Sequence, residues 1–279
     1  MVKLEEDLPQ HITFEQLEDF VTLLMNISGF DLSGYTRSSL KRRVERVMGL
    51  NGMDYTCLKN ALTNKSNFPT YLMHEITVNV TEMFRDPLFY QELEQSVVAY
   101  LRTFPRIKAW SAGCSSGEEV YSLAILLAEN NLYERSFIYG TDINTSVIDI
   151  AKKGIYPLQK IKTYSENFQQ YTSNISLSKY YTVKYGMAIV INELRKNLLF
   201  STHNLATDNV FNEFQLISCR NVLIYFSLEL QRRVIQLFYD SLCPFGFLCL
   251  GSKESLVNHE IKNKFRVVSR KYNIYQKIA

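Results

Sequence analysis

The stretch WSAGCSSGEEVYSLAILLAE, residues 110–129, runs from an apolar strand end through a turn of small residues into an amphipathic helix that opens with two glutamates. A strand, a glycine-containing turn and a helix in this order predict a unit of a doubly wound sheet, which binds ligands at the carboxyl ends of its strands. A phosphate would favour a helix N-terminus without negative charge, because the helix dipole attracts anions. Glu118 and Glu119 stand at that terminus. The turn therefore favours a ligand that carries hydroxyl groups and positive charge.

Short apolar runs alternate with helical patterns through most of the chain after residue 79. Such alternation is typical of an α/β fold with a doubly wound, mostly parallel, Rossmann-like sheet. The spacing predicts helices over 87–104, 118–130, 145–153 and 228–241, and strands over 107–113, 137–143, 198–205, 214–219, 247–252, 265–269 and 273–278.

Two segments depart from this rhythm. Residues 13–75 read as helices only, with apolar residues at helical spacing. Residues 157–198 are rich in Tyr, Ser, Asn and Lys and have partly alternating, strand-forming character. We therefore expect an N-terminal helical domain over 1–78, a sheet domain over 79–279 and a small β-subdomain inserted at 157–198.

Length and composition narrow the class of protein. The 279 residues are 46% hydrophobic and 21% charged, which is typical of a globular chain. The net charge of +3 is too small to argue for nucleic acid binding. No apolar run reaches about 18 to 20 residues, the length that spans a membrane, and the acidic start lacks the apolar core of a secretory signal. We therefore expect a cytoplasmic protein without a membrane segment.

The five cysteines and four histidines are dispersed, without the two-residue spacing of a zinc or redox site. The sequence therefore predicts reduced thiols and no metal site. Cys114 lies in the opening turn and could act as a nucleophile, but no histidine is near in sequence. A small loop residue is the favoured interpretation.

Asp142 ends the next apolar strand, where a doubly wound sheet places an acid that accepts hydrogen bonds from ribose hydroxyls. The alternative is that Asp142 only caps the helix that begins near Asn144. A glycine turn together with a strand-end acid favours a nucleoside ligand. Without a phosphate site, that ligand is best explained as S-adenosylmethionine, whose sulfonium is positive. Glu118 and Glu119 would suit that charge, although acids in a first turn also simply stabilise a helix.

Four runs carry a family resemblance: NVTEMFRD (79–86), WSAGCSSGEE (110–119), GTDIN (140–144) and SCRNVLIYF (218–226). Together and in this order they resemble the chemotaxis receptor glutamate methyltransferases, the CheR family. The resemblance spans nearly the whole chain. It implies an N-terminal helical domain, an adenosylmethionine-binding sheet domain and an inserted β-subdomain.

The resemblance also implies roles for single residues. Arg85 and Tyr225 would orient the reacting carboxylate or the cofactor's own carboxylate. The alternatives without a functional role are a surface ion pair of Arg85 with Asp86 or Glu82, and a core tyrosine at 225 whose hydroxyl has a hydrogen-bond partner. The residues implied to bind the cofactor are Asn79, Thr81, Arg85, Glu118, Glu119, Asp142, Asn204, Leu205, Arg220 and Asn221.

Three positions depart from the family's usual pattern. Met83 stands where the family has the first Phe of its F-F-R motif, and as a soft apolar residue it should still pack. Gln215 replaces a frequent Asp, and GSKE at 251–254 replaces the more usual G-H-S-E. None of these changes removes a residue to which we assign a catalytic role.

A cluster of basic residues lies on the second predicted helix, and we expect it opposite the apolar face of that helix. Such a cluster is usually a solvated surface, but the resemblance implies that it contacts the acidic, glutamate-bearing helices of a chemoreceptor. The inserted β-subdomain resembles one that in some family members binds the receptor's C-terminal tail as an added strand. The basic residues are Lys41, Arg42, Arg43 and Arg46.

The expected activity is methyl transfer from S-adenosylmethionine to glutamate carboxylates of a chemoreceptor. A carboxylate with a pKa of about 4.3 is already ionised at neutral pH, so no general base is needed. One rival is a non-catalytic adaptor with the same fold that binds cofactor or receptor. A second rival is a methyltransferase for RNA or a small molecule, which would favour a broad basic groove or stacking aromatics.

Overall fold

The computed structural model describes residues 11–77, 79–257 and 259–278. The chain divides into two compact units. One contains the described residues up to 77 together with Tyr225–Leu230, and the other contains Asn79–Ile224 and the described residues from Gln231 onward. No helix in the described ranges has both the length and the apolar character needed to cross a membrane.

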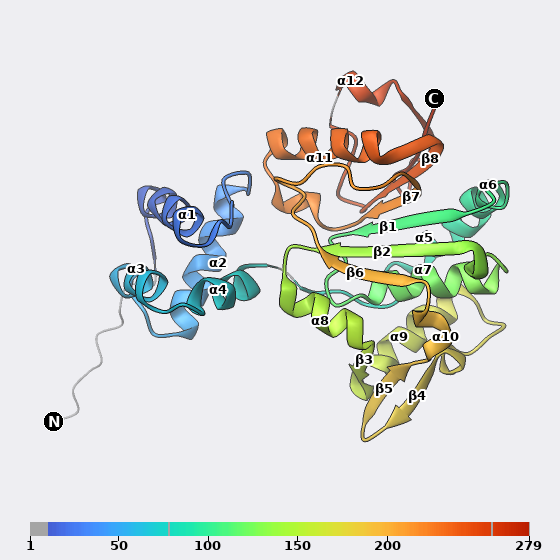
Figure 1. Cartoon of the computed structure of the whole chain (residues 1–279), viewed down its shortest axis with the longest axis horizontal. Helices are drawn as coiled ribbons and strands as arrows, with labels where there is room; N and C mark the ends of the chain where they lie inside the picture. The colour runs from blue at the N-terminus through green and yellow to red at the C-terminus, as the bar shows by residue number, and fades with distance from the viewer. Residues whose placement is uncertain (1–10, 78, 258, 279) are drawn as a thin grey trace. The chain divides into compact units, whose positions relative to one another are not determined.

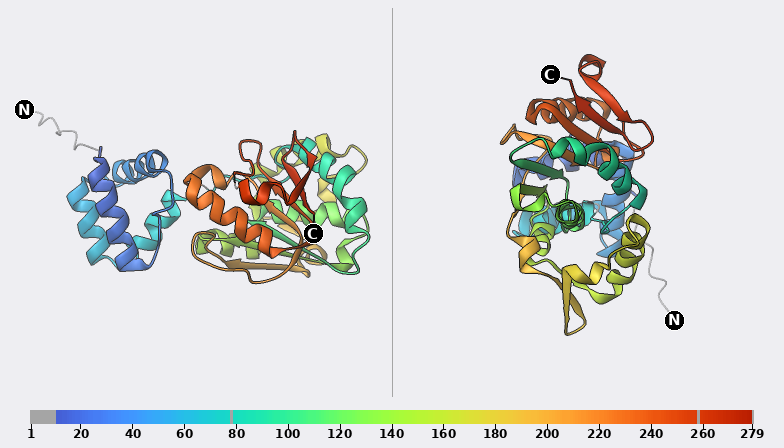
Figure 2. Two further views of the ribbon diagram at one scale, coloured as in Figure 1. Left: turned by 90° about the horizontal axis from the view of Figure 1, so that it is seen from above. Right: turned by 90° about the vertical axis from the view of Figure 1, so that its right-hand side faces the viewer.

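The described residues up to 77 form four helices of the first unit, drawn blue to cyan in Figures 1 and 2. The first begins at a capping box in which Thr13 and Gln16 bond each other's backbone, and it ends at Gly29 with a positive φ of 74°. Fully buried leucines and valines from the four helices form the core. The helices are α1 (Phe14–Ser28), α2 (Arg37–Leu50), α3 (Tyr55–Asn64) and α4 (Phe68–Ile76).

Residues Tyr225–Leu230 belong to this helical unit although they lie between strands of the sheet in the sequence. The N–H of Ser227 donates to the carbonyl of Gly34 at 2.8 Å. Tyr35 and Phe226 form an isolated antiparallel bridge, with their rings edge to face at 5.1 Å. No sequence pattern signalled this return of the chain.

The second unit contains a seven-stranded sheet in the order β6-β2-β1-β7-β8-β10-β9. The first five strands are parallel, and β10 is antiparallel to both of its neighbours. The prediction of a doubly wound, mostly parallel sheet is therefore confirmed (Figure 1). The strands are β1 (Ile107–Ala112), β2 (Ser136–Asp142), β6 (Leu198–Thr202), β7 (Phe214–Cys219), β8 (Leu242–Leu250), β9 (Phe265–Ser269) and β10 (Ile274–Lys277).

Helices cover both faces of this sheet. On one face a Cβ added to Gly140 of β2 would lie 2.7 Å from Val120 of α7 (Glu118–Glu129). On the other face Trp110 of β1 contacts Phe238 of α11 (Leu228–Ser241), with ring centroids 5.3 Å apart. The connection from β2 to β6 begins with α8 (Thr145–Lys153), and the segment before β1 contains α5 (Pro87–Leu93), a π-helical turn (Glu94–Val98) and α6 (Ala99–Leu101).

A three-stranded antiparallel sheet in the order β3-β5-β4 lies between α8 and β6 in the chain. Its strands are β3 (Ile155–Pro157), β4 (Tyr181–Lys184) and β5 (Met187–Val190), followed by α10 (Asn192–Arg195). The same segment contains the helix α9 (Leu158–Tyr171), which the reading of this segment as a β insertion missed. The buried rings of Tyr164, Phe168 and Tyr171 recur along it at helical spacing.

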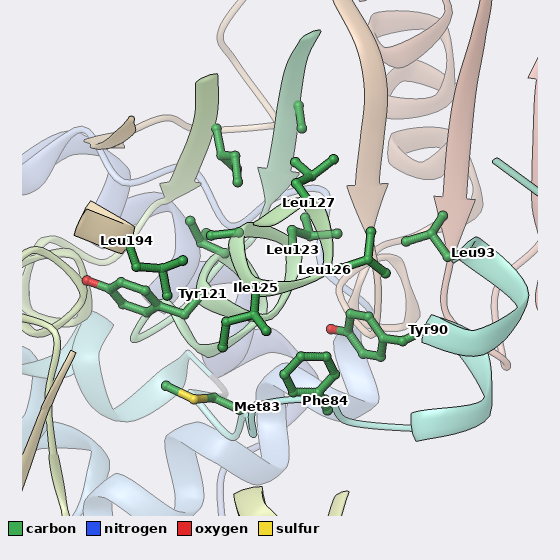
Figure 3. Packing of buried hydrophobic residues seen from close by; sticks show 14 of the residues in the cluster. Met83, Phe84, Tyr90, Leu93, Tyr121, Leu123, Ile125, Leu126, Leu127 and Leu194 are labelled. Atoms are coloured by element: carbon green, nitrogen blue, oxygen red, sulfur yellow. The ribbon is translucent and has the colours of Figure 1, made fainter. Parts of the chain in front are cut away.

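The core of the second unit includes the contact of α7 with the segment before α5 (Figure 3). The ring of Phe84 is fully buried and lies 4.9 Å from Tyr90 and 5.1 Å from Tyr171. The backbone N–H of Phe84 donates to the hydroxyl of Ser122 in α7 at 2.8 Å. Met83 is 4% exposed, so the expectation that it would still pack is confirmed.

Candidate functional site

The turn after β1 is shaped by its glycines. Gly113 and Gly117 have φ angles of 76° and 93°, which residues with a side chain rarely adopt. The N–H groups of Gly113 and Cys114 each donate to the carbonyl of Thr141 at 2.8 Å. A Cβ on Gly117 would lie 2.8 Å from Cβ of Ala151 in α8. The glycines therefore let the turn lie close to the end of β2.

Asp142 ends β2 and holds this turn with its carboxylate. Its Oδ2 accepts the N–H of Ser115 at 2.9 Å, and its Oδ1 accepts the N–H of Asn144 at 3.0 Å. Burial raises the pKa of Asp142, and these two hydrogen bonds oppose that effect. The N-cap of α8 is Asn144, whose side chain accepts from Ser146. The alternative in which Asp142 serves as the cap is therefore wrong.

Glu119 and Arg220 form an ion pair between the first turn of α7 and the end of β7. Nη1 of Arg220 lies 3.4 Å from Glu119, and Nη2 lies 2.8 Å from the carboxylate of Asp86. The hydroxyl of Ser111 in β1 donates to Glu119 at 2.9 Å. The guanidinium of Arg220 also stacks on Phe89, 3.9 Å from the ring centroid. Arg220 is therefore fixed by two carboxylates and an aromatic ring.

Arg85 is linked to the same site through its backbone. Both terminal nitrogens of Arg220 donate to the carbonyl of Arg85 at 3.3 Å. The side chain of Arg85 donates to the carbonyl of Val80, also at 3.3 Å. Within the described ranges no carboxylate lies within ion-pair distance of Arg85, so the alternative of an ion pair with Asp86 or Glu82 is not observed. Asp86 pairs with Arg220 instead.

Glu118 points away from this group. It is fully buried, and its carboxylate accepts from the hydroxyl of Ser116 at 2.7 Å and from the hydroxyl of Tyr164 in α9 at 2.9 Å. The ammonium of Lys160 lies 3.7 Å away. Burial raises the pKa of Glu118, and the bond from Ser116 opposes it. The hydroxyl of Tyr156 donates to the carbonyl of Ser116 at 2.7 Å, so the inserted segment holds the glycine turn at two points.

Asn204 and Leu205 follow β6, at the same edge of the sheet as Asp142. Asn204 forms a closed turn in which its N–H donates to Asp208 and its side-chain oxygen accepts from Ala206, both at 2.9 Å. Leu205 is buried.

The structure thus gathers most of the predicted cofactor residues at the carboxyl ends of neighbouring strands. Glu118 lies in the same turn but is bonded toward α9. The residues at or next to these strand ends are Glu119, Asp142, Asn204, Leu205, Arg220 and Asn221, with Arg85 joined to them through Arg220. Asn79 and Thr81 are half-buried in the segment that leads to Arg85.

Two residues of the site were missed by the sequence reading. Ser111 bonds Glu119, and Glu254 accepts backbone N–H groups from the segment after Arg220. Ser111 lies one position before the end of β1 and gave no signal of its own. Glu254 ends the GSKE run, which resembles a family motif but implied no role.

The thiol of Cys114 is buried, and burial raises its pKa well above the usual value for cysteine. A thiolate nucleophile is therefore disfavoured at this position. Among the described residues, no group of three or more His, Cys, Asp or Glu side chains is placed to hold a metal ion.

The four basic residues of α2 differ in their exposure to solvent. Arg42 is exposed. Lys41 lies 3.2 Å from Glu45 of the same helix, and Arg46 lies 3.7 Å from Glu75 with most of its side chain exposed. These three residues lie at the surface of the helix or partly so, as expected.

Arg43 differs from them, and the expectation that it lies opposite the apolar face is wrong. It is 9% exposed and donates to the carbonyl of Ile76 at 2.7 Å. Its guanidinium lies 4.3 Å from the ring centroid of Tyr225. The carbonyl of Tyr225 accepts from the N–H of Thr36 at 2.9 Å. The stem of Arg43 continues the buried stripe of α2, and its charge is satisfied by the carbonyl and the ring.

Comparison with known proteins identifies the family of the chain. The family model "CheR methyltransferase, SAM binding domain" matches residues 79–274, and "CheR methyltransferase, all-alpha domain" matches residues 15–77. The fold and these matches define an S-adenosylmethionine-dependent methyltransferase. The chain belongs to the CheR methyltransferase family, as its motifs predicted.

Individual relatives are similar over most of this chain. "Putative methyltransferase Cher3" of Pseudomonas putida is 44% identical over 89% of this chain and 91% of its own length. "Chemotaxis protein methyltransferase" of Listeria monocytogenes is 31% identical over 86% of this chain and 89% of its own length. An uncharacterised 104.1 kDa protein of Rhodobacter capsulatus is 30% identical over 99% of this chain but only 29% of its own length.

The residues present fit S-adenosylmethionine. Six buried side-chain polar atoms have no hydrogen-bond partner among the described residues, and two of them, Oγ of Ser115 and Nε of Arg220, belong to residues of this site. Buried polar atoms are normally paired, so both would be satisfied by a bound ligand with hydrogen-bond acceptors. Asp142 stands at the strand end that suits ribose hydroxyls.

Proposed function

We propose that this chain transfers the methyl group of S-adenosylmethionine to glutamate side chains of a chemoreceptor's cytoplasmic helical bundle, forming methyl esters. The observation that carries the proposal is the arrangement of Asp142, Glu119 and Arg220 at adjoining strand ends, joined through Arg220 to Arg85. The names of relatives such as the Listeria chemotaxis protein methyltransferase support the choice of substrate. The proposal also places the chain in the cytoplasm, where that bundle lies.

When bound, S-adenosylmethionine supplies a methyl group on a positively charged sulfur, which is transferred to the acceptor oxygen with a neutral thioether as leaving group. The acceptor carboxylate is already ionised, with a pKa of about 4.3 before any perturbation. The chain therefore needs no general base. This agrees with a site whose acids are engaged: Glu118 binds Ser116 and Tyr164, and Glu119 binds Ser111 and Arg220.

The work of the chain is then to align the reactants and exclude water, because charge is lost in the transition state. We assign Asp142 to the ribose hydroxyls. We assign Arg85 and Tyr225 to orienting a carboxylate. In the described ranges the only hydrogen bond that the Arg85 side chain donates is the one to Val80, so most of its donors remain for a ligand.

Receptor docking is assigned to the exposed basic side chains of α2, chiefly Arg42 and Arg46. Acidic helices would complement them, and such contacts are weakened by salt. Strand β4 offers a second surface, because it is an edge strand of the small sheet and three of its four residues are exposed. A receptor tail could add a strand there.

Glu118 takes a different role in this proposal from the one that the resemblance implied. Its carboxylate is bonded on both oxygens and fully buried. We assign it to anchoring α7 to α9, with the cofactor contact left to Glu119.

The test is transfer of a labelled methyl group from S-adenosylmethionine to receptor-containing membranes or receptor fragments. Label that is released as methanol by base, and that is lost in Arg85→Ala and Asp142→Ala, supports a carboxyl methyl ester made at this site. Base-stable label would contradict the proposal and indicate another acceptor. Cofactor binding without any label, on receptor substrate confirmed active with a known methyltransferase, would favour the adaptor.

A further inference from the structure

Glu254 has no role assigned so far, yet in the described part of the sheet unit no other carboxylate accepts as many hydrogen bonds. It is 6% exposed and follows β8. Its Oε2 accepts the N–H of Asn221 at 3.0 Å and that of Gly251 at 2.5 Å. Its Oε1 accepts the N–H of Val222 at 2.8 Å and that of Ile224 at 3.4 Å. Four backbone donors thus converge on one carboxylate.

Three of these four donors, the N–H groups of Asn221, Val222 and Ile224, belong to a segment that cannot satisfy them by itself. Residues 221–224 lead into a short 3₁₀ turn, whose first N–H groups have no partner within the turn. Asn221 has a φ of 63°, in the left-handed region that non-glycine residues rarely adopt. A strained residue persists only where its surroundings hold it in place. Charge-assisted hydrogen bonds from these N–H groups to a buried carboxylate hold the segment in place.

The turn that carries Glu254 is itself held in place by its neighbours. A Cβ on Gly251 would lie 2.6 Å from Oε2 of Glu254 and 2.8 Å from the backbone nitrogen of Asn221. Only glycine at 251 therefore leaves room for the carboxylate. The side chain of Asn273 donates to the carbonyls of Gly251 and Glu254 at 2.9 and 2.8 Å. The turn that carries Glu254 is thus fixed to Asn273, the residue before β10.

The segment of residues 221–224 contacts the glycine turn directly. A Cβ on Gly113 would lie 2.4 Å from Cγ2 of Val222, so the Val222 side chain lies against the backbone of that turn. Arg220, which pairs with Glu119, immediately precedes the segment. The segment that Glu254 holds therefore contacts the Gly113 turn through Val222 and continues from Arg220, and both belong to the candidate cofactor site.

We propose that Glu254 is a positioning residue of the cofactor site, which sets the backbone of residues 221–224 so that Asn221, Arg220 and the Gly113 turn meet the cofactor. This inference deepens the proposed function and rests on it for the identity of the reaction. It gives a physical role to the last residue of the GSKE run.

The test compares Glu254→Gln with Glu94→Gln in the full chain. The amide keeps the shape of the side chain but turns one acceptor oxygen into a donor, so two of the four N–H groups lose their acceptor. Glu94 is a matched control, because it accepts from Asn130 at 2.8 Å and Tyr171 at 2.9 Å and has no bond to residues 220–224. Hydrogen exchange of residues 220–224 and titration with S-adenosylhomocysteine are measured for both variants.

We expect exchange at 220–224 to become at least about tenfold faster in Glu254→Gln, and S-adenosylhomocysteine to bind at least about tenfold more weakly. Glu94→Gln should leave both unchanged even where it lowers the melting temperature equally. Unchanged exchange at 220–224, or faster exchange with unchanged affinity, would overturn the proposal. Wild-type protein that binds S-adenosylhomocysteine but labels no receptor would refute the proposed function alone, since the exchange and affinity comparison does not use methyl transfer.

Discussion

The assignment of Asp142 to the cofactor can be tested by a substitution that changes a single side-chain group. In Asp142→Asn one acceptor oxygen becomes an amide donor, which would face the N–H of Ser115 or Asn144 and could no longer accept from a ribose hydroxyl. We expect S-adenosylhomocysteine affinity to fall by about 1.5 to 3 kcal/mol, the usual range for a hydrogen bond to a charged group. Isothermal titration measures the loss. The control is Asp149→Asn on exposed α8 surface, and an equal loss in that variant would contradict the assignment.

Substitution of Arg220 tests whether its ion pairs with Asp86 and Glu119 support the cofactor site. A lysine keeps the charge but cannot reach Asp86, Glu119 and the carbonyl of Arg85 at once, and it cannot stack flat on Phe89. We expect Arg220→Lys to lower the free energy of unfolding by about 1 to 3 kcal/mol and to weaken cofactor binding. Chemical denaturation and titration report the two effects. Wild-type affinity in this variant would remove Arg220 from the site.

His203 makes a pH prediction. Burial lowers the pKa of its imidazole below 6.5, so the folded chain binds a proton there less readily than the unfolded chain. Stability is then unaffected above about pH 6.5 and falls as the pH drops below that value. His203→Phe keeps the edge contact with Trp110, 5.3 Å between centroids, and removes the titration. Denaturation at about pH 7.5 and 5.5 should show a smaller acid loss in the variant. An identical loss would contradict the prediction.

The hydrogen bond from Tyr164 of α9 to Glu118 of α7 is one of two bonds by which the inserted segment holds the region of the glycine turn, the other being the bond from Tyr156 to Ser116. Tyr164→Phe leaves one oxygen of the buried Glu118 without its hydroxyl donor. We expect a loss of about 1 to 3 kcal/mol in the free energy of unfolding, since a buried carboxylate oxygen that loses a hydrogen-bond donor is costly. Tyr139→Phe is the control, because that ring is only half-buried and water can replace its bond to Asn212. Equal, small losses in the two variants would show that Glu118 does not depend on α9.

Sequence patterns predicted the regular elements of the sheet unit well. The strand at 214–219 and the helix at 145–153 have the predicted bounds, because apolar periodicity and caps are local signals. Helix α9 was missed, since its buried face is made of isoleucine, tyrosine and phenylalanine, which also favour strands. The short α4 was not recognised as a separate helix.

The site was predictable only in part. Motif residues such as Asp142 and Arg220 could be chosen from the sequence, because the resemblance pointed to them. The burial of Arg43 and the bonds of Glu254 could not, since each depends on segments far away in the sequence, Tyr225 in one case and residues 221–224 in the other. The direction of Glu118 toward Tyr164 depends on the missed helix.

At the scale of the whole molecule, two neighbouring arginines of α2 are expected to serve different purposes: Arg42 binds the receptor and Arg43 stabilises the fold. Arg42→Glu reverses an exposed charge, so we expect a higher KM for receptor, a loss that grows at low salt, and unchanged S-adenosylhomocysteine affinity. Arg43→Met removes a buried charge bonded to Ile76 and stacked on Tyr225, so we expect a lower melting temperature. Steady-state methylation and thermal unfolding measure the two. Wild-type receptor KM in Arg42→Glu would contradict docking through this helix.

The central claim is that the acceptor is a glutamate carboxylate. It is tested most directly by mass spectrometry of receptor fragments after incubation with the chain and S-adenosylmethionine, with Asp142→Ala as the inactive control. We predict a mass increase of one methylene on glutamates of the helical bundle, absent in the control and reversed by mild base. Methylation confined to another residue type, or resistant to base, would contradict the account.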